Sequence, residues 1–467
     1  MKTYWFLLLL LLVALTAHAC TIVSGTDRLG QTWAMNNEDF FHTYANYVNV
    51  YPATDQHTLG YLTLTFGAPE GSIQGGSNEA GVFFDLNALP PQPYKLRRGR
   101  KPFPYGSMLV YLLQRCASVP QFLALWDKYY LPEMGNVQLH LADKYGNLAV
   151  ITPDTIVRAK KQLVSTNFNV CDTGPGKASC WRYPITQRLL ATGGISHANL
   201  VQIAAATSWR EFTTTLYTNI HNLSTGDSWF YLAEDYQTPW QTNIHTLLKG
   251  GRRSFLLASK FPRNASLHLT RLLTRSGDTS AVTYFLQISR FSAPQKESML
   301  RLAFLHQFYI EHTFDQAARL FALWAQYVAA NPRLDPTEVQ FTKAEVLATQ
   351  GENAAAIGVL QAVRQPSWKT TALLASLQGQ DPPIVRLQLA GFPAAQAVVV
   401  EVKGDYQFYR FLQPTPQGWV LPLQTTRKEL KYCYYVAGKR VLDPTQPRLE
   451  KQETVKGDLA PFNVWRL

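Results

Sequence analysis

The stretch ALTAHACTIVSGT, Ala14–Thr26, joins an apolar leader to the first strand-like run of the chain. The leader is too short to span a bilayer, and two small residues, Ala17 and Ala19, stand at positions −3 and −1 before Cys20. Signal peptidase cleaves after this pattern. The sequence therefore predicts a signal peptide over residues 1–19, export of the protein, and a mature chain that begins with Cys20.

The length and composition indicate a globular protein of several domains. At 467 residues the chain is too long for one core, so two or three domains are expected. The net charge of +12 favours anionic partners, but there is no zinc-finger spacing, Walker motif or basic–aromatic repeat that would predict nucleic acid. The sequence predicts no metal, no cofactor and no transmembrane segment after the leader.

Residues 20–262 alternate short β-rich runs with turns that contain Gly, Asp and Asn. The helical pattern YGSMLVYLLQRCASVPQFLALWDKYY is interrupted near Pro120. The runs that predict strands are CTIVSG, QTWAMNN, YVNVYP, YLTLTFG, GVFFDLNAL, VQLHLAD, NLAVITPD, TTTLYTNIHNL and SWFYLAE. This pattern is typical of an α/β or α+β domain of enzyme size that is mostly sheet.

The rest of the chain predicts two further regions. Residues 263–378 contain two helical hairpins that weakly resemble tetratricopeptide repeats, and two units are too few for a free-standing solenoid. Residues 379–467 show regularly spaced strand runs and predict a small β-sandwich. Their order, with GDYQFY and YYVAGKRVLDP, resembles the early-set glycogen-binding modules. The tryptophans that would grip sugar are missing, so carbohydrate binding is not expected.

Two local features of the first domain carry hypotheses of their own. The basic cluster KLRRGRK, residues 95–101, predicts a solvated loop, and the alternative is that Arg97 and Arg98 lie at a pocket mouth and favour anionic substrates. Five cysteines leave at least one thiol unpaired. Cys171 and Cys180 are close enough in sequence to form a disulfide in an exported protein.

Cleavage after Ala19 would give Cys20 both a thiol and a free α-amine. The reference pKa of an α-amine is near 8, so this amine can accept the thiol proton close to neutral pH. Nucleophile and base would then lie in one residue, as in N-terminal threonine hydrolases. Side-chain amides are suitable donors for the oxyanion that forms during acyl transfer.

The order CTIVSG, MNNEDF, GGSNEAGVFFDLNAL, STNFN and CWRY resembles the N-terminal-nucleophile hydrolases of the choloylglycine hydrolase and penicillin V acylase family. The similarity is strongest to the branch that hydrolyses linear amides, and it spans residues 20–262. It implies a four-layer αββα sandwich, Cys20 as nucleophile and Asp39 as the carboxylate that orients the α-amine. It also implies that Asn87 and Asn167 lie near the oxyanion and the amine, and that Arg182 shapes the charge around the thiolate.

One position departs from the family pattern. Asn36 stands where bile-salt hydrolases have an arginine, so its neutral amide cannot lower the thiol pKa as a guanidinium would. We expect Asn36 on the substrate side of the site and expect small amides other than bile salts as substrates. Two alternatives stay open from the sequence: an acyltransferase with the same nucleophile, and an exported or lipid-anchored binding protein.

Overall fold

The computed structural model divides the chain into two compact units, Met1–Asn264 and Ala265–Leu467. It describes residues 20–41, 44–55, 58–89, 99–130, 134, 137–153, 155–171, 180–209, 213–262, 264, 282, 286–287, 292–363, 366, 368–378, 384–392, 398–403, 408–416, 418–424, 429–436, 439–453 and 459–466. The division into parts at 20–262, 263–378 and 379–467 stays a prediction.

Two antiparallel sheets form the centre of the first unit. The six-stranded sheet has the order β12-β1-β2-β13-β14-β15, and the eight-stranded sheet has the order β11-β10-β9-β6-β5-β4-β3-β16. The strands of the first sheet are β1 Thr21–Thr26, β2 Thr32–Phe41, β12 Gln162–Ser165, β13 Thr213–Asn222, β14 Asp227–Leu232 and β15 Trp240–Asn243. Those of the second are β3 Asn46–Tyr51, β4 Tyr61–Phe66, β5 Ser72–Asn78, β6 Val82–Ala88, β9 Val137–Asp143, β10 Leu148–Ile151, β11 Ile156–Ala159 and β16 Arg253–Leu256.

Strand alternation determines which side chains lie between the sheets. Ile22, Ala34 and Phe83 belong to one buried cluster that both sheets supply. Their neighbours Val23 and Met35 lie on the opposite face, in a cluster with the helices that cover the six-stranded sheet. Successive residues of a strand point to opposite faces, so each sheet has one face toward its partner sheet and one toward helices.

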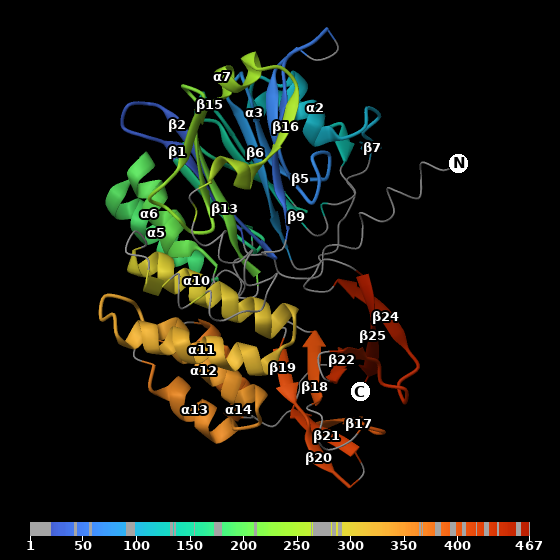
Figure 1. Cartoon of the computed structure of the whole chain (residues 1–467). Helices are drawn as coiled ribbons and strands as arrows, with labels where there is room; N and C mark the ends of the chain where they lie inside the picture. Colours follow the sequence, from blue (N-terminus) through green and yellow to red (C-terminus); the bar gives the residue numbers. More distant parts are fainter. Residues whose placement is uncertain are drawn as a thin grey trace. The chain divides into compact units, whose positions relative to one another are not determined.

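Helices cover the outer face of each sheet (Figure 1). The pair α5 (Arg182–Gly193) and α6 (His197–Thr207) packs on the six-stranded sheet, and α2 (Met108–Arg115) and α3 (Val119–Trp126) pack on the eight-stranded sheet. The expected interruption near Pro120 is confirmed, because α3 begins there with the proline in its first turn. The first unit therefore has the layer order helix, sheet, sheet, helix.

The second unit begins with helices. They are α10 Ala293–Leu305, α11 Phe314–Ala329, α12 Thr337–Thr349, α13 Asn353–Gln361 and α14 Trp368–Gln378, with a π-helical turn at His306–Ile310. The helices α12 and α13 share a buried cluster with α14. The helical character expected here is observed, and the similarity to tetratricopeptide repeats stays a prediction. Among the described residues, no helix is long and apolar enough to cross a lipid bilayer.

Strands follow in two sheets, of order β17-β21-β20 and β19-β18-β22-β25-β24, with β23 paired to β22. Their bounds are β17 Ile384–Leu389, β18 Val398–Lys403, β19 Phe408–Phe411, β20 Gln413–Thr415, β21 Gly418–Gln424, β22 Glu429–Val436, β23 Lys439–Val441, β24 Leu449–Glu453 and β25 Leu459–Arg466. Leu387 and Trp419 of the smaller sheet share one buried cluster with Val400 and Tyr434 of the larger. Trp419 is therefore a core residue.

Candidate active site

Cys20 lies at the head of β1, one residue before the first strand pair of the six-stranded sheet. It is buried, with 2% of its surface exposed. The neighbouring strand β2 runs antiparallel to β1, and its C-terminal half contains the motif NNEDF, residues 36–40. Because side chains alternate along β2, this motif divides between the two faces of the sheet.

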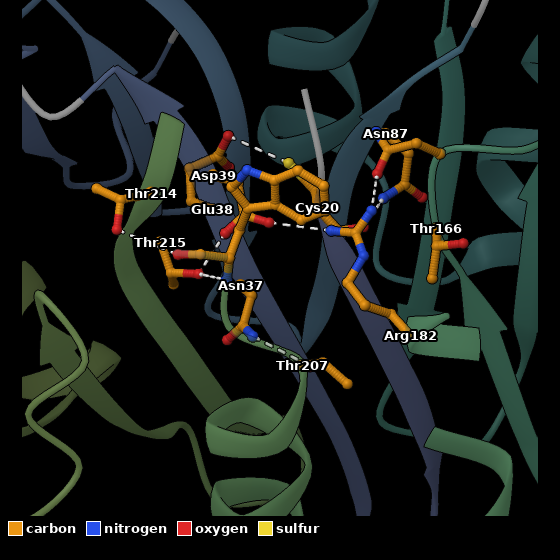
Figure 2. A network of polar contacts seen from close by, with 12 residues as sticks. Cys20, Asn37, Glu38, Asp39, Asn87, Thr166, Arg182, Thr207, Thr214 and Thr215 are labelled. Atoms are coloured by element: carbon orange, nitrogen blue, oxygen red, sulfur yellow. Dashed lines mark hydrogen bonds and ion pairs between the residues drawn. The ribbon is translucent and has the colours of Figure 1, made fainter. Parts of the chain in front are cut away.

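One face of β2 brings Glu38 to the nucleophile. The Cys20 thiol donates to Glu38 Oε1 across 3.5 Å between sulfur and oxygen, as Figure 2 shows. The other carboxyl oxygen, Oε2, accepts from Asn36 Nδ2 at 3.0 Å and from the Tyr217 hydroxyl at 3.5 Å. All four side chains are buried. The group that touches the sulfur is therefore a carboxyl that the sequence reasoning did not identify.

The other face of β2 holds Asp39 in an ion pair. Arg182, the first residue of α5, donates from a guanidinium nitrogen to Asp39 Oδ2 at 3.0 Å. The Thr215 hydroxyl on β13 donates to Asp39 Oδ1. Arg182 also donates to Asn167 Oδ1 at 2.7 Å and lies over the Trp209 ring, 5.4 Å from its centroid. The structure thus joins three of the expected residues, Asp39, Asn167 and Arg182, in one chain of contacts.

Asn87 approaches Cys20 from the eight-stranded sheet. Its Nδ2 donates to the backbone carbonyl of Cys20 at 3.3 Å. Its Oδ1 accepts from Gln138 Nε2 at 3.4 Å, and the same nitrogen donates to the Thr166 carbonyl at 2.6 Å. Asn167 Nδ2 donates to the Ala88 carbonyl at 2.9 Å. The two expected asparagines are therefore held at the same end of the sandwich as Cys20.

Burial and three carboxyl groups shape the electrostatics of the thiol. Burial raises the pKa of Cys20 well above its usual value, and the charges of Glu38, Asp39 and Asp85 raise it further. The backbone N–H of Asp39 donates to the sulfur and opposes this shift. A neutral thiol is therefore the resting form, and its attack on a carbonyl needs a group that takes the proton.

The carboxyl groups themselves are shifted. Burial raises the pKa of Glu38 to about 7. Burial, followed by the charge of Glu38, raises the pKa of Asp85 well above its usual value. Burial also raises the pKa of Asp39, and Arg182 opposes that shift. Because a guanidinium stays protonated and lies 3.0 Å away, we take Asp39 as the ionised member of an ion pair.

The remaining expected site residues lie elsewhere or outside the described part. Arg97 and Arg98 fall outside the described residues, so their contact with substrate stays a prediction. Arg100 of the same basic cluster is described. Its guanidinium lies 3.8 Å from the carboxylate of Asp127 and over the Trp126 ring, in the helical layer on the eight-stranded sheet. Asn36 is buried against Glu38, and its contact with substrate also stays a prediction.

The two cysteines of the expected disulfide contact different threonines. Cys180 carries a free thiol, and its sulfur lies 3.0 Å from Thr166 Oγ1. The sulfur of Cys171 lies 3.7 Å from Thr152 Oγ1. The structure does not join these two cysteines, and the disulfide stays a prediction for the oxidised protein.

Glu38, Asp85 and Tyr217 are the site residues that sequence reasoning missed. Glu38 could have been found from the sequence. Every second residue of the strand paired with Cys20 shares one face of the sheet, and Asn36 and Glu38 are two such residues. Asp85 and Asn87 are likewise two apart on β6. Tyr217 had no such signal, because its strand β13 pairs with β2 although the two strands are far apart in the sequence. Within the described residues, no group of three or more His, Cys, Asp or Glu side chains could hold a metal ion.

Comparison with known proteins gave structural matches only. No protein-family model and no curated protein matches the sequence. Similar solved structures include two variants of conjugated bile acid hydrolase from Clostridium perfringens. Each is 11% identical to this chain. The alignments include 96% of each neighbour and 51% and 50% of this chain, with TM-scores of 0.39 and 0.37. Penicillin V acylase from Agrobacterium tumefaciens is 14% identical, with a TM-score of 0.37 over 50% of this chain and 90% of its own.

These neighbours are the two kinds of enzyme that the sequence resemblance names. The matches cover about half of this chain.

Proposed function

We propose that the mature protein is an exported amidohydrolase with Cys20 as its N-terminal nucleophile, acting on small linear amides. The observation that carries this proposal is the position of the Cys20 sulfur. The sulfur lies at the head of β1, next to the Glu38 carboxyl and the backbone N–H of Asp39. Asn87 donates to the backbone carbonyl of Cys20. Buried polar side chains of this variety around one thiol are typical of a reaction centre.

In the proposed reaction the thiol attacks the amide carbonyl and its proton passes to the α-amine of Cys20. The ion pair of Asp39 and Arg182 supports that end of the site, and the Asp39 carboxylate favours the protonated amine. Asn87 Nδ2 carries two N–H groups, and we assign the one that does not bind the Cys20 carbonyl to the oxyanion. The amine then leaves with the proton, and water hydrolyses the thioester.

The test is an amide panel with the purified mature protein. We expect turnover of linear amides, its loss in Cys20→Ala, and folded protein in both cases by circular dichroism. A variant with one extra residue before Cys20 should lose most turnover because it has no α-amine at that position. Full activity of this extended form would overturn the role of the α-amine, and a panel without any turnover would overturn the hydrolase.

The anionic preference is a separate part of the proposal. Replacing Arg97 and Arg98 with glutamine should lower kcat/KM for acidic amides more than for neutral ones, because charge steering acts on association. The difference should shrink as salt rises. An equal response of both substrate classes would assign the loop to the solvated surface.

A further inference from the structure

Glu38 touches the nucleophile, and the proposed function makes no use of it. We propose that Glu38 is a second catalytic base, which takes the proton of the Cys20 thiol and returns it to the leaving amine. This inference rests on the proposed function and adds a carboxyl route beside the α-amine.

The geometry aims one oxygen of Glu38 at the sulfur. Oε1 accepts from the thiol at 3.5 Å, whereas Oε2 is occupied by Asn36 Nδ2 at 3.0 Å and faces the Tyr217 hydroxyl at 3.5 Å. The two donors on Oε2 hold the carboxyl plane and leave Oε1 as the oxygen for the thiol proton. Because only 3% of Glu38 is exposed, solvent does not compete strongly for that position.

Among the described residues, the side chains bonded to Glu38 are neutral: the Cys20 thiol, the Asn36 amide and the Tyr217 hydroxyl. In the mature protein the α-amine of Cys20 would add one group that can carry a positive charge. From β2 itself, neutral Asn36 faces Glu38, whereas the carboxyl of Asp39 lies on the other face of the strand. The guanidinium of Arg182 contacts Asp39, on the other face of the strand. A base that lacks a cation partner and is removed from water holds a proton more tightly than an exposed carboxylate.

The other elements packed around Glu38 add titratable groups of the same kind. Tyr217 from β13 is a neutral phenol that donates to it. Asp85 from β6 faces the same space. Its charge raises the pKa of Cys20 and Tyr217, and the charge of Glu38 in turn raises the pKa of Asp85. Burial raises the pKa of Glu38 to about 7, which is the range in which a general base is most effective at neutral pH.

The proposed step balances without any further reactant. The S–H bond of Cys20 breaks, its proton binds Glu38 Oε1, and the sulfur lone pair forms the S–C bond while the carbonyl π pair becomes the oxyanion. When the oxyanion collapses, the C–N bond breaks and its pair stays on nitrogen, which takes the proton from Glu38. In deacylation, Glu38 accepts a proton from the attacking water and returns it to the thiolate.

The first measurement is the pH dependence of amide turnover in Glu38→Gln. The substitution keeps the shape and removes the proton acceptor, so we expect kcat/KM to fall about 10²- to 10⁴-fold. The limb of the wild-type profile with a midpoint near 7 should disappear. Glu38→Asp keeps a carboxylate and should retain that limb at a lower rate. An unchanged limb in Glu38→Gln would overturn the proposal.

The second measurement needs no substrate. Alkylation of Cys20 by iodoacetamide can be followed by mass spectrometry on the tryptic peptide of the mature N-terminus, residues 20–28, which contains one cysteine. Loss of the Glu38 charge should move the midpoint of the alkylation curve to lower pH, although amide turnover falls. Looser packing would raise the rate without moving the midpoint, and an unmoved midpoint would overturn the proposal.

Two matched variants serve as controls. Glu70 is an exposed carboxylate that pairs with Arg252, and Glu70→Gln should change neither profile. Asp85→Asn removes a second buried carboxyl that is not bonded to the sulfur, so it should keep the limb in turnover. If Asp85→Asn abolished the limb as Glu38→Gln does, net charge and not proton transfer by Glu38 would explain it. If wild-type protein turned over no amide, the proposed function would fail, and the alkylation midpoint would still report on Glu38.

Discussion

Each compact unit of this chain contains a buried cysteine that lies against a buried glutamate and a tyrosine. In the first unit the Cys20 sulfur lies 3.5 Å from Glu38, and in the second the Cys433 sulfur lies 3.6 Å from Glu401. The Tyr435 hydroxyl donates to Glu401 at 2.8 Å. The thiol–carboxyl contact is therefore nearly the same in both places.

The surroundings of the two thiols differ. Cys433 lies in the middle of β22, and its backbone is paired with Glu401 on β18. Cys20 precedes β1, so its own backbone stands outside the strand ladder. Asn87 and the Asp39 backbone N–H also reach it. The comparison teaches that a carboxyl beside a thiol does not by itself define a nucleophile. The mechanism that we propose also requires a free α-amine and oxyanion donors at the same residue.

The largest expected difference concerns the thiols themselves. Cys20→Ala should lower amide turnover by about 10³-fold or more, because the acyl-enzyme cannot form. Cys433→Ala should leave turnover unchanged and reduce stability, because it leaves a small cavity in a buried sheet. Steady-state kinetics and thermal unfolding of both variants measure this. Loss of turnover in Cys433→Ala with a folded protein would remove the distinction between the two sites.

The second prediction concerns the buried ion pair of Asp39 and Arg182. Removing one partner of a buried ion pair leaves the other charge unpaired, so Asp39→Asn and Arg182→Met should each reduce stability by about 3–5 kcal/mol. The double variant should lose less than the sum of the two single losses. Urea unfolding of the three variants measures the coupling. Strictly additive losses would show that the pair contributes nothing as a pair.

The third prediction uses the pH dependence of stability. Glu38 binds its proton more tightly in the folded protein, with a pKa of about 7, than in the unfolded chain, where it is 4.5. Between these values the folded state binds more protons, so its stability falls as pH rises. The shift corresponds to about 3 kcal/mol. Denaturant unfolding of Glu38→Gln between pH 4.5 and 7 should therefore show a smaller decline than that of wild type. An equal decline would contradict the assignment.

The smallest expected effect concerns the tyrosine at each site, and here the larger loss of stability is expected in the second unit. The Tyr435 hydroxyl bonds Glu401 at 2.8 Å, whereas that of Tyr217 lies 3.5 Å from Glu38, at the limit of a hydrogen bond. Tyr435→Phe should cost about 1–2 kcal/mol of unfolding free energy, and Tyr217→Phe should cost less. Equal losses in denaturant unfolding would show that the longer contact is as strong as the shorter one.

Much of the first unit could be predicted from local sequence. β-rich runs between Gly, Asp or Asn turns predicted strands at residues 31–37 and 81–89. The structure has β2 and β6 there, and β2 continues to Phe41. Helices α5 and α6, residues 182–207, were not predicted, since their apolar residues show little helical periodicity. The side chains that meet at Cys20 could be predicted only where a motif or an alternation rule placed them.

The sequence by itself determined that Cys20 follows a signal-like leader, that its strand begins there, and which motifs accompany it. Only the tertiary structure decided that the Glu38 carboxyl, and not the Asp39 carboxyl, touches the sulfur, and that Arg182 reaches Asp39 from 143 residues away. The physical reason is that local sequence sets strand period and chain ends, whereas contacts between strands depend on sheet register. A shift of one residue in that register would exchange the two faces of β2, and Asp39 would then face Cys20.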